Sequence, residues 1–159
     1  MLSVGNKVFI PNYGAGIVEN VEFRKVYDTI YKILDIKLMI DKINLSIPFN
    51  RVEAYRIREI VTPEKLLECF EIIKEKPLKL EKKWSKRYRE NNDKLYNGSL
   101  DKECEVLRDL YYLKSEGIMP PGEQKILSKA EDLVSSEAML VLDMDIERIY
   151  EIIRSLIVK

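Results

Sequence analysis

The residues Val61-Thr62-Pro63 divide the sequence into two parts that have different patterns. Before them, apolar and polar residues partly alternate over short stretches that turn residues interrupt, which is typical of β-strands. After them, apolar residues recur every three or four positions, which is typical of amphipathic helices. The sequence therefore predicts an α+β protein of two domains, residues 1–61 and residues 62–159.

The first part is predicted to consist of short strands joined by tight turns. Pro11, Asn12 and Gly14 form one turn signal, and Asp41-Lys42 forms another. Several short strands on tight turns favour a small barrel of the SH3 or Tudor type. The predicted strands are residues 7–10, 16–26, 29–40, 43–47 and 51–55.

The second part is predicted to form an all-helical bundle of about five helices. Thr62 is a candidate N-cap of the first helix, because its side chain can accept a hydrogen bond from a free backbone N–H. A helix that contains Trp84 is expected to end at Gly98, and Asp143 or Asp145 can cap the last helix. The apolar stripes of these helices are most simply explained as bundle core.

Trp84, the single tryptophan, lies in the basic run Lys82-Lys83-Trp84-Ser85-Lys86-Arg87-Tyr88-Arg89. Cations can neutralise phosphates, and an aromatic ring can stack on a base or wedge between bases. The whole chain carries 27 basic and 27 acidic residues, so any affinity for nucleic acid must come from such a local patch. The structural alternative is equally concrete. Trp84 falls close to one helix face with Leu80, Tyr88 and Leu95, so periodicity alone favours a buried tryptophan and a solvated basic run.

Composition narrows the function further. A hydrophobic content of 46% and a charged content of 34% suit a soluble globular protein. The chain has no histidine, and it lacks a phosphate-binding glycine loop, a nucleophile motif and clustered metal-ligand acids. We therefore expect no catalytic residue, no metal, no cofactor and no enzymatic activity. Cys69 and Cys104 are expected to be buried thiols, and a cytoplasmic protein without a membrane partner is expected because no signal peptide or spanning segment is evident.

Short motifs occur in a fixed order along nearly the whole chain, at residues 4–8, 11–16, 84–91, 105–111, 122–123 and 127–130. This ordered set resembles the CarD/CdnL family of bacterial transcription regulators. The resemblance implies a first domain that binds the RNA polymerase β subunit. It also implies a helical second domain that contacts promoter DNA weakly, without sequence specificity, at the minor groove beside the upstream edge of the transcription bubble. The protein would act as a monomer that modulates open-complex stability.

The resemblance also implies DNA-contacting residues. Trp84 matches a tryptophan that inserts at the minor groove, and Lys86, Arg87 and Arg89 match the cations that hold phosphates beside it. Further along the chain, Lys125 keeps a positive charge, although members of the family often carry more basic residues in this region.

On the first domain, the resemblance implies a polymerase-binding surface. Arg24 falls where some members have a polymerase-contacting arginine. Ser46, next to Ile47 and Pro48, falls where some members have a second arginine, so this contact departs from the family pattern. A second function stays open at this point: an adaptor that binds only protein, with Trp84 in the core and the basic run solvated.

Overall fold

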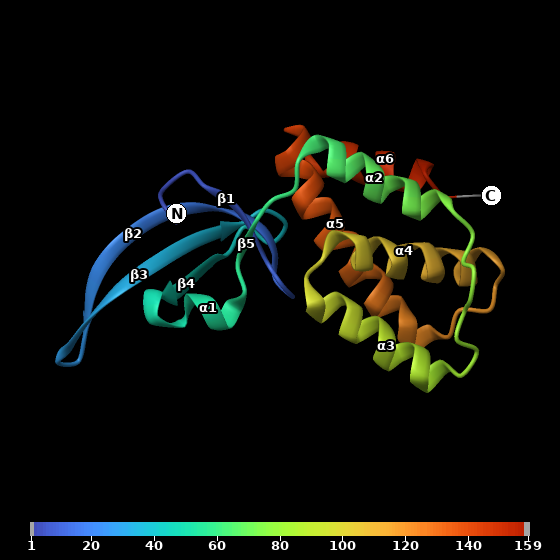
Figure 1. Ribbon diagram of the computed structural model, residues 1–159, viewed down its shortest axis with the longest axis horizontal. Coiled ribbons are helices and arrows are strands. Elements are labelled where there is room, and N and C mark those ends of the chain that lie inside the picture. Colours follow the sequence, from blue (N-terminus) through green and yellow to red (C-terminus); the bar gives the residue numbers. More distant parts are fainter. Residues whose placement is uncertain (1, 158–159) are drawn as a thin grey trace.

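The computed structural model describes residues 2–157, in which an antiparallel sheet precedes a group of helices (Figure 1). The strands lie in the order β4-β3-β2-β1-β5, and each neighbouring pair is antiparallel. The protein is thus of the α+β class, as predicted. The strands are β1 (Lys7–Ile10), β2 (Gly14–Val26), β3 (Thr29–Leu38), β4 (Asn44–Pro48) and β5 (Arg58–Glu59).

Strands β2 and β3 form a long hairpin that extends away from the helices (Figure 1). Strand β4 pairs only with residues 33–37 of β3, so the distal half of the hairpin has no third strand beside it. Phe23 and Ile30, which the alternating pattern places on a buried face, are therefore 71% and 66% exposed. The apolar cluster of the sheet lies nearer the helices and contains Val8, Ile10, Val18, Leu34, Ile36, Leu38 and Ile47.

The prediction of a strand at residues 51–55 is wrong. After Pro48 the chain forms the short helices η1 (Phe49–Arg51) and α1 (Val52–Tyr55). Val52 and Tyr55 lie three residues apart, and both pack against the apolar cluster of the sheet, as one helical turn allows. Arg56 ends this turn in a left-handed conformation, with φ of +54°, and the chain then enters β5, which the sequence did not predict.

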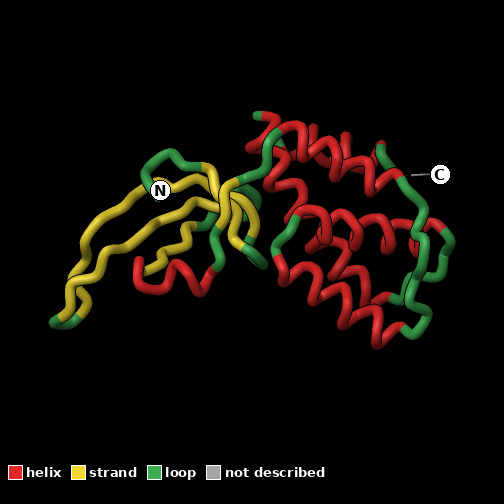
Figure 2. Tube along the Cα trace, in the orientation of Figure 1, coloured by secondary structure: helices red, strands yellow, loops and turns green. Residues whose placement is uncertain are grey.

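The helices after residue 61 begin and end at the predicted signals. The side chain of Thr62 accepts a hydrogen bond from the N–H of Lys65 at 3.2 Å, and Asp145 caps the last helix in the same way. Gly98 ends the Trp84 helix with φ of +81°. Figure 2 shows these helices grouped apart from the strands. They are α2 (Pro63–Lys74), α3 (Trp84–Asn97), α4 (Leu100–Ser115), η2 (Pro121–Glu123), α5 (Gln124–Leu142) and α6 (Ile146–Ser155).

A shielded ion pair joins the sheet to the helices. Both carboxylate oxygens of Glu137, on α5, accept hydrogen bonds from Arg58, on β5, at 2.7 Å each. The same carboxylate accepts the N–H of Val61 at 2.8 Å, and the guanidinium of Arg58 lies 4.3 Å from the ring centroid of Phe9. The side chain of Glu137 is fully buried. Because separation would leave this carboxylate buried without its cation, the pair Arg58–Glu137 holds the two parts together.

Two close backbone approaches join the same two parts. The N–H of Ala15 donates to the hydroxyl of Ser136 at 2.9 Å, so the start of β2 contacts α5 directly. A Cβ atom at Gly98 would lie only 2.6 Å from Pro11, so the end of α3 can contact the β1–β2 turn only because residue 98 is glycine. Ala15 and Phe9 also belong to the apolar core of the helices, so one core continues across the junction.

The two cysteines of the chain lie on α2 and α4. Cys69 and Cys104 are free and buried, as expected. Between residues 2 and 157, no helix combines the length and the apolar character that crossing a bilayer requires. Within the same range, no group of three or more metal-ligating side chains is close enough together to hold an ion.

Candidate nucleic-acid interface

The aromatic residues of α3 face solvent. Trp84 is the first residue of the helix and is 60% exposed, and Tyr88, one turn later, is 42% exposed. The prediction from periodicity that Trp84 is buried is therefore wrong. The buried stripe of α3 consists of Arg87, Asn91 and Leu95, which are spaced four residues apart. Two of these three residues are polar, so an apolar pattern could not identify the inner face of this helix.

Arg87 fixes which face of α3 is buried and which faces solvent. Its Nε and Nη2 atoms donate to the two carboxylate oxygens of Glu123, at 2.8 Å each, and its Nη1 donates to the main-chain oxygen of Glu81 at 2.8 Å. The two side chains are only 8% and 1% exposed. Loss of either partner from such a buried bidentate pair would leave the other charge buried without compensation. Arg87 therefore attaches α3 to η2, and its guanidinium is already bound to acceptors within the protein.

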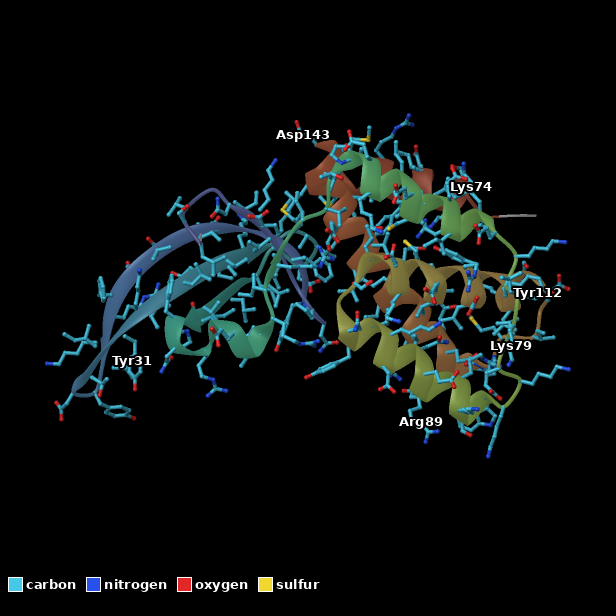
Figure 3. All side chains as sticks on the ribbon, in the orientation of Figure 1. Tyr31, Lys74, Lys79, Arg89, Tyr112 and Asp143 are labelled. Atoms are coloured by element: carbon cyan, nitrogen blue, oxygen red, sulfur yellow. The ribbon has the colours of Figure 1, made fainter. Side chains whose placement is uncertain are left out.

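The remaining predicted cations lie at the surface. Lys86 is exposed, but its Nζ lies 3.3 Å from a carboxylate oxygen of Glu81 and 4.0 Å from one of Glu90. Arg89 is exposed, and Figure 3 shows its side chain extending from α3 away from the other helices. It forms no ion pair with another residue in the range 2–157. Lys125 is exposed in the first turn of α5, two residues after Glu123, so the buried ion pair brings its helix against α3.

The residues predicted to bind polymerase are arranged around one carboxylate. Asp35, on β3, accepts hydrogen bonds from Arg24, on β2, and from the hydroxyl of Ser46, on β4, the latter at 2.5 Å. Arg24 also donates to Glu22, and its side chain is 39% exposed. The structure thus brings Arg24 and Ser46 together across three neighbouring strands. Ile47 is fully buried in the sheet cluster, so its side chain cannot contact a partner without rearrangement.

Asp35 is the member of this cluster that the sequence analysis missed. Burial alone would raise the pKa of Asp35, but hydrogen bonds from Ser46 and Arg24 and the charge of Arg24 outweigh burial and lower it. The carboxylate therefore stays ionised and fixes the position of Arg24. A signal was present in the sequence: an aspartate inside an apolar strand pattern requires a partner, because a buried charge is costly without one. Pro48, at the end of β4, is half-buried beside this cluster.

Comparison with known proteins identifies the family. The model of the domain described as "CarD, C-terminal domain" matches residues 68–154, which is more than half of the chain. This chain belongs to the CarD family. The match includes all of α3, α4 and α5, and hence Trp84, Lys86, Arg87, Arg89 and Lys125.

This CarD-family protein is similar to a protein of Bacillus subtilis (strain 168). That protein, named "Putative transcription factor YdeB", is 26% identical over 141 residues, which span 89% of this chain and 92% of the relative. The alignment therefore extends beyond the matched helical domain into the strand region. The two comparisons together support a transcription regulator.

Proposed function

We propose that this protein regulates transcription initiation by binding the RNA polymerase β subunit through residues 1–61 and promoter DNA through residues 62–159. The observation that carries the DNA contact is the exposure of Trp84 on the same helix as the exposed cations Lys86 and Arg89. Exposing an indole ring to water costs free energy, whereas the ring gains favourable contacts when it enters a DNA groove or stacks on a base.

The proposed mechanism uses binding alone and needs no cofactor. An apolar wedge at the minor groove costs a few kcal/mol of unstacking, and the cost is least where strands already separate. Trp84 would therefore favour the upstream edge of the bubble over closed duplex. A factor shifts an equilibrium only by binding one state better than the other, so this preference would stabilise the open complex. One wedge and several phosphate contacts carry little sequence information, so base sequence is not expected to be read directly.

The proposed polymerase contact lies on the sheet. We expect the Tudor-like part, residues 1–61, to present Arg24, Ser46 and Pro48 to the β subunit. Arg24 is held at the surface by Asp35, which supports a contact that needs a fixed guanidinium. Strands β4 and β5 are the outer strands of the sheet, and an unpaired strand edge can pair with another protein. We expect a monomer that acts in the cytoplasm, where polymerase and promoters are found.

Binding to free duplex DNA tests the DNA contact. We expect weak affinity that decreases by orders of magnitude between about 50 and 200 mM salt, because each phosphate contact releases counterions. Acrylamide quenching of Trp84 fluorescence should be strong in the free protein and weaker when DNA is added. Salt-independent binding, or quenching that DNA leaves unchanged, would favour the second candidate function.

That second candidate is an adaptor that binds only protein. The observation in its favour is the local compensation of charge at Lys86, which lies close to two carboxylates. The adaptor would bind polymerase as strongly as the regulator would, but would leave open-complex lifetime unchanged.

The variant Arg24→Glu tests the polymerase contact. We expect it to reduce capture of the β subunit by the full-length protein, because it reverses the charge at the proposed contact. It also places a carboxylate beside Asp35 and Glu22, so the melting temperature must be measured as well. The matched control is Lys25→Glu, which makes the same charge change one residue later, on the opposite face of β2.

Two results would contradict this assignment. Equal capture by Arg24→Glu and by the wild type would exclude Arg24 from the contact. Equal loss in both variants, with unchanged melting, would indicate a general charge effect rather than a contact at Arg24.

A further inference from the structure

The segment that joins α2 to α3, residues 75–83, is rich in exposed cations. Lys76, Lys79, Lys82 and Lys83 are all exposed, whereas the segment contains only two acids. One of these acids, Glu81, is already engaged: its carboxylate accepts the N–H of Lys83 at 3.2 Å and lies 3.3 Å from Lys86. The positive charge of this segment is therefore largely uncompensated.

The segment is held in place rather than free to move. The main-chain oxygen of Glu81 accepts a hydrogen bond from the buried Arg87, and Leu80 packs against the core of the helices. Figure 3 shows Lys79 on this segment, at the end of the helical part that lies away from the sheet. A backbone segment that is already ordered loses less conformational entropy on binding than a mobile one, so this placement suits a binding surface.

Lys79 and Lys82 line a surface groove of about 620 Å³ together with Lys86, which belongs to the proposed DNA surface. Lys86 shares its charge with Glu81 and Glu90, whereas neither Lys79 nor Lys82 enters an ion pair with any residue between 2 and 157. Lys79 and Lys82, which precede α3, are thus the cations of this groove that can bind an anion.

Exposed apolar side chains lie on both sides of these lysines in the sequence. Leu78 is 95% exposed and Trp84 is 60% exposed. Cations combined with exposed apolar side chains suit the minor groove of DNA, where phosphates line both edges and an apolar side chain can wedge between base steps. An acidic protein surface would match the charge but would not explain the exposed leucine.

We propose that the segment 75–83 is a second DNA-contacting element, in which Lys79 and Lys82 bind phosphates adjacent to those near Trp84. This inference rests on the proposed function, and it names contacts outside the basic residues of α3. The segment extends the DNA-binding surface from the first turn of α3 toward the end of the helical part that is distant from polymerase.

The test is the salt dependence of duplex binding by the full-length double variant Lys79→Gln, Lys82→Gln. Each phosphate contact contributes about 0.9 to the slope of log affinity against log salt, so two lost contacts should reduce the slope by about 1.8. Between about 50 and 200 mM salt, the ratio of wild-type to variant affinity should therefore change by about 12-fold. Lys83 is left unchanged because it is the N-cap residue of α3.

The matched control is Lys102→Gln, Arg148→Gln, which removes two exposed cations from α4 and α6. A reduced slope in the test variant but not in the control supports the inference. An equal slope in test variant and wild type overturns it and leaves the proposed function intact. Absence of DNA binding by the wild type overturns both. Normal DNA binding combined with loss of polymerase capture would also overturn it, because it would assign Lys79 and Lys82 to an acidic protein surface.

Discussion

Replacing Arg87 with alanine is expected to destabilise the helical part by about 3–5 kcal/mol, because Glu123 would remain buried without its cation. For a chain of this size, such a loss corresponds to a decrease in melting temperature of about 6–20 °C. Arg89→Ala makes the same chemical change two residues later, at an exposed position, and should alter stability by no more than about 0.5 kcal/mol. Denaturant titration of the two variants gives the comparison directly.

The two arginines are therefore expected to separate into different roles. Arg89→Ala should weaken DNA binding and reduce its salt dependence, while Arg87→Ala should mainly lower stability. Arg87→Lys keeps the charge but loses the bidentate geometry, so it should be less stable than the wild type and more stable than Arg87→Ala. An Arg87→Ala variant that melts like the wild type but no longer binds DNA would contradict the buried ion pair.

Trp84→Ala is expected to abolish the effect of the protein on open-complex lifetime while leaving folding and polymerase capture unchanged. A lost stacking contact is worth about 1–3 kcal/mol, or roughly a five- to 150-fold change in an equilibrium constant. The large destabilisation typical of a buried aromatic residue is not expected, because the indole is 60% exposed. Melting curves and open-complex decay, measured on the same variant, test both statements.

Tyr96→Ala provides the matched control for this variant. Tyr96 is also an exposed aromatic residue of α3, at 63%, but it lies at the other end of the helix, against Arg56. It should leave open-complex decay unchanged. A Trp84→Ala variant with unchanged decay would remove the wedge from the mechanism, and a large decrease in its melting temperature would indicate a structural role instead.

The division of the chain into strands and helices was predictable because local signals determine it. The cap at Thr62 and the left-handed end of α3 at Gly98 depend only on neighbouring residues, and both occur as predicted. The misassigned strand at residues 51–55 depends on packing against distant strands, which no local pattern contains. The exposure of Phe23 likewise follows from the short length of β4, a property of another segment.

The sequence identified the candidate site as a basic region, but it could not show which of its side chains are exposed and which are buried. Arg87 and Arg89 stand in the same basic run, and only a partner 36 positions away, Glu123, separates their roles. Periodicity placed Trp84 in the core because it weighs apolar residues, whereas α3 buries an arginine and an asparagine. A polar inner face of this kind can be recognised only when the acid that neutralises it is known.

The ion pair Arg58–Glu137 has a consequence for where on a promoter the protein can act. It joins the proposed polymerase-binding part to the proposed DNA-contacting part without a flexible linker, so the distance and rotation between them are fixed. Successive base pairs rotate around the DNA axis, completing a turn in about 10.5 base pairs. A rigid protein that docks on polymerase as proposed would therefore present Trp84 to the minor groove only at particular helical phases. Promoters would then differ in their response through the spacing between polymerase and bubble edge, even where no base is read.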